Sequence, residues 1–93
     1  MQLTNITIAP VNDGKLKAFV NIAFDGEFIV RGIKVIERND GGLFVAMPAR
    51  KATDGTWKDM AHPLTAEFRK MLSERVLNEY EKQKGKLEEP GGF

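Results

Sequence analysis

Lys15 to Phe24 reads KLKAFVNIAF. Apolar side chains occupy every second position of this run, and polar side chains fill most of the positions between them. A period of two predicts a β-strand with one buried face and one face in water. The buried face of this strand is expected to consist of Leu16, Ala18, Val20, Ile22 and Phe24.

Turn sequences flank this strand on both sides. Asn12-Asp13-Gly14 precedes it and Asp25-Gly26 follows it, and these residue types tolerate the positive φ angles of tight hairpin turns. The runs beyond the turns, residues 3–8 and 28–36, are rich in β-branched side chains, which favours antiparallel strands. Inside the second run the alternation changes parity at Gly32, and this change predicts a β-bulge or a sharp bend.

Residues 43–47 read LFVAM and are apolar at successive positions. Such a run is typical of a strand that is covered on both faces. The chain's own helix can cover one face, and we expect a second subunit to cover the other. Pro48 has no N–H to donate and should end the strand. A further strand is expected within residues 56–61, after the Asp54-Gly55 turn.

The last third of the chain has the period of a helix. Apolar side chains recur three and four residues apart, and Thr65 stands where an N-cap is expected. The pattern weakens at Lys84-Gly85. We therefore predict an α+β fold, with an antiparallel sheet of about five strands and one C-terminal α-helix, as a single domain over residues 1–84 with a flexible tail over 85–93. The apolar stripe of the helix is Phe68, Met71, Leu72, Val76 and Tyr80.

Size and charge limit the function. A chain of 93 residues buries only about 60–65% of its unfolded surface, so a partner subunit would stabilise it. The 14 Lys and Arg residues against 13 Asp and Glu leave a net charge of +1. Binding of nucleic acid through bulk charge is therefore not expected, and any such binding must use a local basic patch.

The sequence also indicates a compartment. It has no cysteine, which fits a reducing cytoplasm because disulfides and thiolate metal sites are then impossible. The first eleven residues do not resemble a signal peptide. No run approaches the roughly 18–20 apolar residues that cross a bilayer. We expect a cytoplasmic protein without a membrane partner.

Few residues are available for catalysis. The chain has one histidine, His62, and one serine, Ser73, which falls on the polar side of the predicted helix. A nucleophile needs a base and an orienting group around it, and this placement favours neither. No glycine-rich phosphate loop is present. We predict no enzyme activity, no cofactor, no metal site and no small-molecule substrate, and we interpret His62 as a structural residue at the corner before the helix.

One segment resembles a known family. Gly42 to Pro63 reads GLFVAMPARKATDGTWKDMAHP and is similar to the signature of the stage V sporulation protein G (SpoVG) family. The opening MQLTNITIAPVNDGKLKAF, the run FIVRGIKVIE and the helical VLNEY also resemble that family. The resemblance covers about residues 1–82. It departs from the family pattern at Ala49, in the order Arg50-Lys51, and at Ala52-Thr53, where the family has Thr-Pro.

The resemblance implies a function. Proteins of this family are bacterial, cytoplasmic homodimers joined through their strands, linked to cell septation or sporulation, and understood to bind DNA and in some cases RNA as gene regulators. The family's leading nucleic-acid contact corresponds to Arg50 and Lys51 here. On sequence alone, an ordinary basic loop kept for solubility is the simpler interpretation of this pair, and the resemblance reverses that preference.

Three other basic residues are candidates for the same patch. Lys58 lies in the next short strand, and Arg69 and Lys70 open the helix, where they oppose its dipole. A solvated helix face is an equal alternative for the last two. Trp57 could stack on a base, although a packing or interface role is favoured. The dimer interface is expected to include Leu43, Phe44, Val45, Met47 and Trp57.

Two further functions stay open beside a dimeric nucleic-acid-binding regulator. The chain could be a protein-interaction factor in septum assembly that does not bind nucleic acid, since its charge is nearly neutral and the face of its helix is mixed. An enzyme is the least favoured. The recognised sequence and the preference between DNA and RNA do not follow from the residues.

Overall fold

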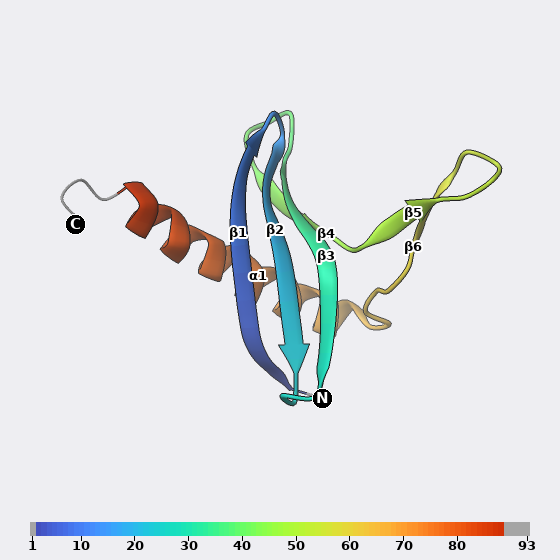
Figure 1. The fold of residues 1–93 in the computed structure, drawn as a ribbon, viewed down its shortest axis with the longest axis horizontal. Coiled ribbons are helices and arrows are strands. Elements are labelled where there is room, and N and C mark those ends of the chain that lie inside the picture. Colours follow the sequence, from blue (N-terminus) through green and yellow to red (C-terminus); the bar gives the residue numbers. More distant parts are fainter. Residues whose placement is uncertain (1, 89–93) are drawn as a thin grey trace.

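The structure of the chain, a computed structural model, describes residues 2–88 and confirms the α+β class (Figure 1). In chain order, the described residues form six strands and one helix. These elements are β1 (Leu3–Asp13), β2 (Leu16–Phe24), β3 (Phe28–Glu37), β4 (Leu43–Ala46), β5 (Ala49–Lys51), β6 (Trp57–Asp59) and α1 (Ala66–Glu88).

The first four strands form one antiparallel sheet in the order β1-β2-β3-β4. Asp25 and Gly26 have φ angles of 55° and 66° in the turn between β2 and β3, as a type I′ hairpin turn requires. The register passes from Val20↔Ile33 to Ile22↔Val30. Arg31 and Gly32 therefore both lie opposite Asn21, and the predicted bulge at Gly32 is confirmed.

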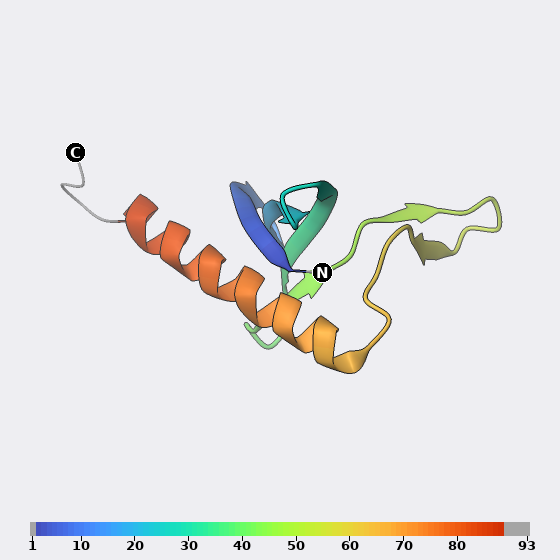
Figure 2. The ribbon, with the colours of Figure 1, turned by 90° about the horizontal axis from the view of Figure 1, so that it is seen from below.

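The helix covers one face of this sheet (Figures 1 and 2). Both predicted apolar faces meet there: Val20, Ile22 and Val76 are fully buried between the sheet and α1. The ring of Phe24 lies 6.1 Å from that of Phe68, centroid to centroid. Burial of apolar surface between these two elements is the dominant stabilising contribution to the fold. The core consists of Leu3, Ala18, Val20, Ile22, Phe24, Ile33, Val35, Met47, Leu72, Val76 and Tyr80.

The predicted start of the helix is confirmed, whereas its predicted end differs from the structure. The amide of Phe68 donates to Oγ1 of Thr65 at 3.1 Å, so the predicted N-cap is confirmed. The helix continues to Glu88, past the end predicted at Lys84-Gly85. A glycine inside a helix costs only about 0.5–1 kcal/mol relative to alanine, which good helix formers beside it can offset. Of the predicted tail, residues 85–88 are helical and 89–93 lie outside the described residues.

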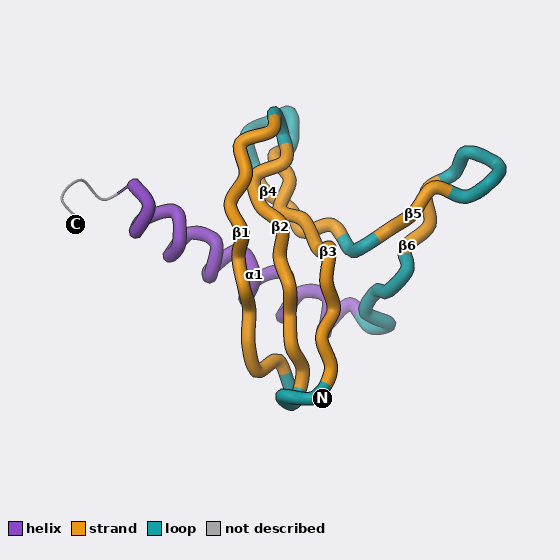
Figure 3. Tube along the Cα trace, in the orientation of Figure 1, coloured by secondary structure: helices purple, strands orange, loops and turns teal. Residues whose placement is uncertain are grey.

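The strands do not all belong to one sheet. β5 and β6 pair only with each other and form a separate two-stranded ribbon that projects from the body (Figure 3). Pro48 separates β4 from β5, and its carbonyl accepts a 2.7 Å hydrogen bond from the amide of Met60 at the base of the ribbon. A four-stranded sheet and a ribbon thus replace the single sheet of about five strands. In residues 2–88 there is no helix long and apolar enough to span a membrane.

Candidate nucleic-acid interface

The ribbon, residues 49–59, is organised by its turn. The amide and the hydroxyl of Thr56 both donate to Oδ1 of Asp54, at 3.0 and 2.6 Å. These hydrogen bonds hold the pKa of the Asp54 carboxyl below its usual range because they stabilise its charged form. Gly55 has a φ angle of 90°, and the amide of Ala52 donates to the carbonyl of Thr56 at 2.7 Å. Local hydrogen bonds therefore set the ribbon's geometry.

The register of the ribbon assigns its side chains to two faces. Arg50 lies opposite Lys58, and Lys51 lies opposite Trp57. Side chains of residues directly opposite each other point to the same face of an antiparallel pair, and neighbours along a strand point to opposite faces. One face therefore carries Arg50 and Lys58, and the other carries Lys51 and Trp57.

This arrangement changes the predicted patch. Arg50 and Lys51 are adjacent in the sequence, but they lie on opposite faces of the ribbon, and the cation that shares a face with Arg50 is Lys58. Sequence reasoning named Lys58 without pairing it. The Asp54-Gly55 turn was the available signal, because counting outward from a turn gives the cross-strand partners.

All three basic side chains of the ribbon are exposed. Among the side chains of residues 2–83 the ion pair that the structure shows is Lys17 with Glu37, at 3.8 Å. Arg50, Lys51 and Lys58 form no ion pair with the described acidic side chains. Their charges are therefore open to an anion in solution.

The remaining basic candidates lie apart from the ribbon. Arg69 and Lys70 are exposed in the first turns of α1, which packs on the sheet while the ribbon projects away from it (Figure 2). The predicted patch is thus divided between two elements, with three basic residues on the ribbon and two on the helix.

The residues expected at a dimer interface have different surroundings in the single chain. Met47 belongs to the core and is 8% exposed, and Leu43 and Val45 pack against that core. Phe44 has the opposite parity in β4, and the Arg38 guanidinium lies 5.5 Å from its ring centroid, within the range of a cation–π contact. Trp57 is 68% exposed. The ring is therefore not packed in the core of the single chain, and its place in a dimer interface stays a prediction.

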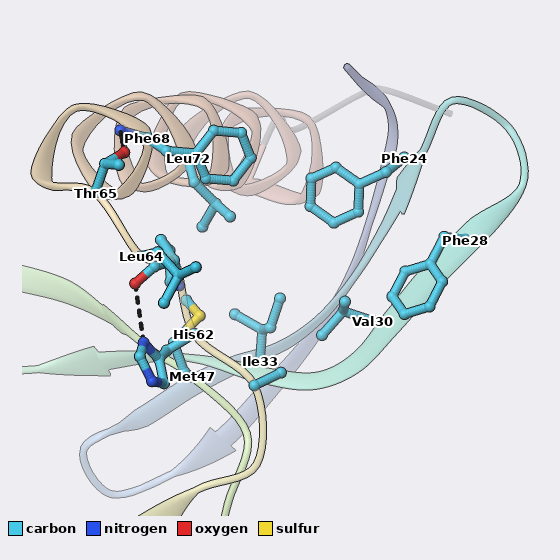
Figure 4. Close-up of a pocket in the computed structure, with 12 residues that line it drawn as sticks. Phe24, Phe28, Val30, Ile33, Met47, His62, Leu64, Thr65, Phe68 and Leu72 are labelled. Atoms are coloured by element: carbon cyan, nitrogen blue, oxygen red, sulfur yellow. Dashed lines mark hydrogen bonds between the residues drawn. The ribbon is translucent and has the colours of Figure 1, made fainter. Parts of the chain in front are cut away.

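An open apolar groove lies between the turn after β2, the segment that leads into α1, and the start of the helix (Figure 4). Its volume is about 480 Å³, and Phe28, Met47, Leu64 and Leu72 are among its lining residues. His62 stands at this groove with Nδ1 2.9 Å from the carbonyl oxygen of Pro63. That contact joins neighbouring residues at the corner before the helix, and the structural role of His62 stays a prediction.

Comparison with known proteins identifies relatives over nearly the whole chain. Residues 1–82 match the SpoVG family. Three relatives bear the name "Putative septation protein SpoVG", and each is 47% identical to this chain. They come from Anaeromyxobacter sp. (strain Fw109-5), Caldanaerobacter subterraneus subsp. tengcongensis and Clostridium acetobutylicum. The matches cover 99%, 90% and 95% of this chain, and 96%, 92% and 93% of the respective relatives.

Proposed function

The chain belongs to the SpoVG family, and from this we propose that it is a cytoplasmic, dimeric nucleic-acid-binding regulator associated with septation or sporulation. The septation part rests on the names of its relatives. The binding part rests on the ribbon, whose exposed cations form no ion pair with the acidic side chains of residues 2–83.

The pair Arg50 and Lys58 is the observation that carries the binding proposal. These two cations share one face of the ribbon, and that face carries no acidic residue, since Asp59 has the opposite parity. Phosphate contacts supply most of the affinity of such interfaces, and an arginine can also bond bidentately to guanine. The ribbon projects from the body (Figure 3), so a polyanion can approach this face without meeting the sheet.

A second copy of the chain would raise the affinity for nucleic acid, because two cations on one ribbon make only a weak contact. β4 is an edge strand of the main sheet, and an unpaired edge offers backbone donors and acceptors to another strand. We propose that two copies join at this strand, with Phe44 on the sheet face that the helix leaves open. Two ribbons in one dimer raise the affinity through multivalency.

Binding of duplex DNA by matched charge variants tests the site. The Arg50→Ala/Lys58→Ala variant should lower affinity and reduce the log–log salt slope by about 1.8 for each ribbon that contacts the DNA, or about 3.6 for the proposed dimer, at about 0.9 for each phosphate that the variant no longer neutralises. The control, Arg75→Ala/Lys82→Ala, removes two exposed cations from α1 and changes the net charge equally. It should leave both quantities nearly unchanged. Equal decreases in the two variants would show that bulk charge, and not the ribbon, binds DNA.

A protein-interaction role in septum assembly is the second candidate. The groove at the start of α1 favours it, because Leu64 is 92% exposed and Phe28 is 64% exposed beside that groove. Large exposed apolar patches mark interaction sites. Capture of a septal protein after nuclease treatment, together with no mobility shift on DNA or RNA, would favour this role over the first.

A non-enzymatic function is part of the proposal. The relatives are named as septation proteins, and the one histidine of the chain has its Nδ1 at hydrogen-bonding distance from a backbone carbonyl. Turnover of any substrate that is abolished by His62→Ala would contradict this part alone.

A further inference from the structure

The second face of the ribbon carries Lys51 and Trp57. Binding of a phosphate would use the cation of this face but not its aromatic ring. The two residues are directly opposite each other, so their Cβ atoms are about 4.5–5.5 Å apart. Both side chains are exposed, and Trp57 presents 68% of its surface to water. A flat aromatic ring thus stands beside a free cation on a projecting element.

The rest of the chain does not account for this exposed ring. Among the side chains of residues 2–83, the aromatic pair is Phe24 with Phe68 and the cation–π contact is Arg38 with Phe44. Neither of these contacts involves Trp57. β6 has no buried residue, so the ring does not anchor the ribbon to the core. Both its position and its surface are available to a ligand.

We propose that this face binds single-stranded nucleic acid, with an unpaired base stacked on Trp57 and a neighbouring phosphate on Lys51. The inference rests on the proposed nucleic-acid function and names its substrate class. Bases inside a duplex are already stacked on each other, so their faces are available only in single strands, loops and ends. Stacking needs no base-specific hydrogen bond, and the proposed contact is therefore tolerant of sequence.

Asp59 limits the part of this face that can bind a phosphate. It lies opposite Ala49, two residues from Trp57 and so about 7 Å toward the base of the ribbon. A phosphate is repelled there and attracted at Lys51, which places the backbone of the bound strand toward the tip. Replacing Asp59 by asparagine should tighten single-strand binding for this reason.

The chain contains one tryptophan, so its tryptophan emission, excited selectively over that of Tyr80, reports on Trp57 alone. The probe is a single-stranded oligothymidylate, compared with a blunt duplex of the same length. The single strand should quench Trp57, and the duplex should quench it far less. Trp57→Leu should weaken single-strand binding roughly 5- to 150-fold, the range measured when stacking aromatics are removed, and leave duplex binding nearly unchanged. Trp57→Phe keeps an aromatic face and should retain part of the affinity.

The outcomes separate this inference from the proposed function. Binding of both probes without quenching, and without weakening in Trp57→Leu, overturns stacking and leaves the regulator proposal intact. Binding of neither probe overturns both. A Trp57 emission that shifts to the blue as protein concentration rises, in the absence of nucleic acid, shows that a second copy covers the ring and overturns stacking. Urea unfolding of each variant checks that the fold is retained.

Discussion

The body and the ribbon of this protein are held together by different means. In the body, strands of nine to eleven residues, β1, β2 and β3, enclose a continuous core with α1. In the ribbon, two strands of three residues are exposed at every position. The body depends on apolar burial, whereas the ribbon depends on a turn and three residue pairs.

This difference separates stability from binding. A two-stranded hairpin is marginal by itself in water, so the ribbon contributes little to folding and can carry charged and aromatic side chains at small cost. The body contributes the free energy of folding, and the hydrogen bond from Met60 to Pro48 closes the ribbon at its base. Substitutions in the two regions should therefore affect different measurements.

The largest effect is expected in the core. Ile22 is fully buried, so Ile22→Ala should lower the free energy of unfolding by about 2–5 kcal/mol through reduced burial and a cavity. Ile29 belongs to the neighbouring strand and is 50% exposed, so Ile29→Ala should cost at most about 1 kcal/mol. Trp57→Leu, in the ribbon, should change stability by less than about 0.5 kcal/mol.

Urea unfolding at one fixed protein concentration measures all three variants, since stability of a dimer depends on concentration. A destabilisation of Trp57→Leu as large as that of Ile22→Ala would show that the ribbon is part of the folded core.

A smaller effect is expected where the chain returns from the ribbon to the body. Thr65→Ala removes the hydroxyl that accepts from the Phe68 amide and should lower stability by about 1 kcal/mol. Thr65→Ser keeps that acceptor and should stay close to the parent in thermal unfolding. Equal destabilisation by both substitutions would mean that the threonine methyl group, and not the cap, is what matters.

The smallest effect concerns the ribbon's turn at low pH. Hydrogen bonds from Thr56 hold the folded pKa of Asp54 below its ordinary value of 3.8. The stabilisation of the turn is therefore complete above that pH and is lost as pH falls through the folded pKa. The amide chemical shift of Thr56 should follow this titration in the parent and not in Asp54→Ala. The carboxyl is exposed, so unfolding of the body should not follow it, and parallel titration of core amides would contradict the separation.

Prediction from the sequence succeeded where the pattern is local. The face of β2 and the stripe of α1 follow from periods of two and of three to four, and Gly32 was recognisable because the parity changes around it. The helix end was less predictable, since the cost of Gly85 is small and neighbouring residues offset it. The separate ribbon was also missed, because sequence does not show whether β5 extends the sheet or leaves it after Pro48.

The candidate site, like the fold, could be predicted from the sequence only in part. Its basic residues could be named as candidates from sequence, but their grouping could not, because Arg50 and Lys51 are neighbours along the chain and lie on opposite faces of the ribbon.

By itself, the sequence determined the fold class, the family and most of the two apolar faces that meet in the core, because hydrophobic periodicity and a long motif are properties of the chain read in order. Leu16 was predicted to be buried but is not part of the core. Only the tertiary structure decided that Arg50 shares a face with Lys58 and Lys51 with Trp57, and that Trp57 is mostly exposed in the single chain. Both depend on strand register, which hydrogen bonds across a turn establish between residues distant in sequence.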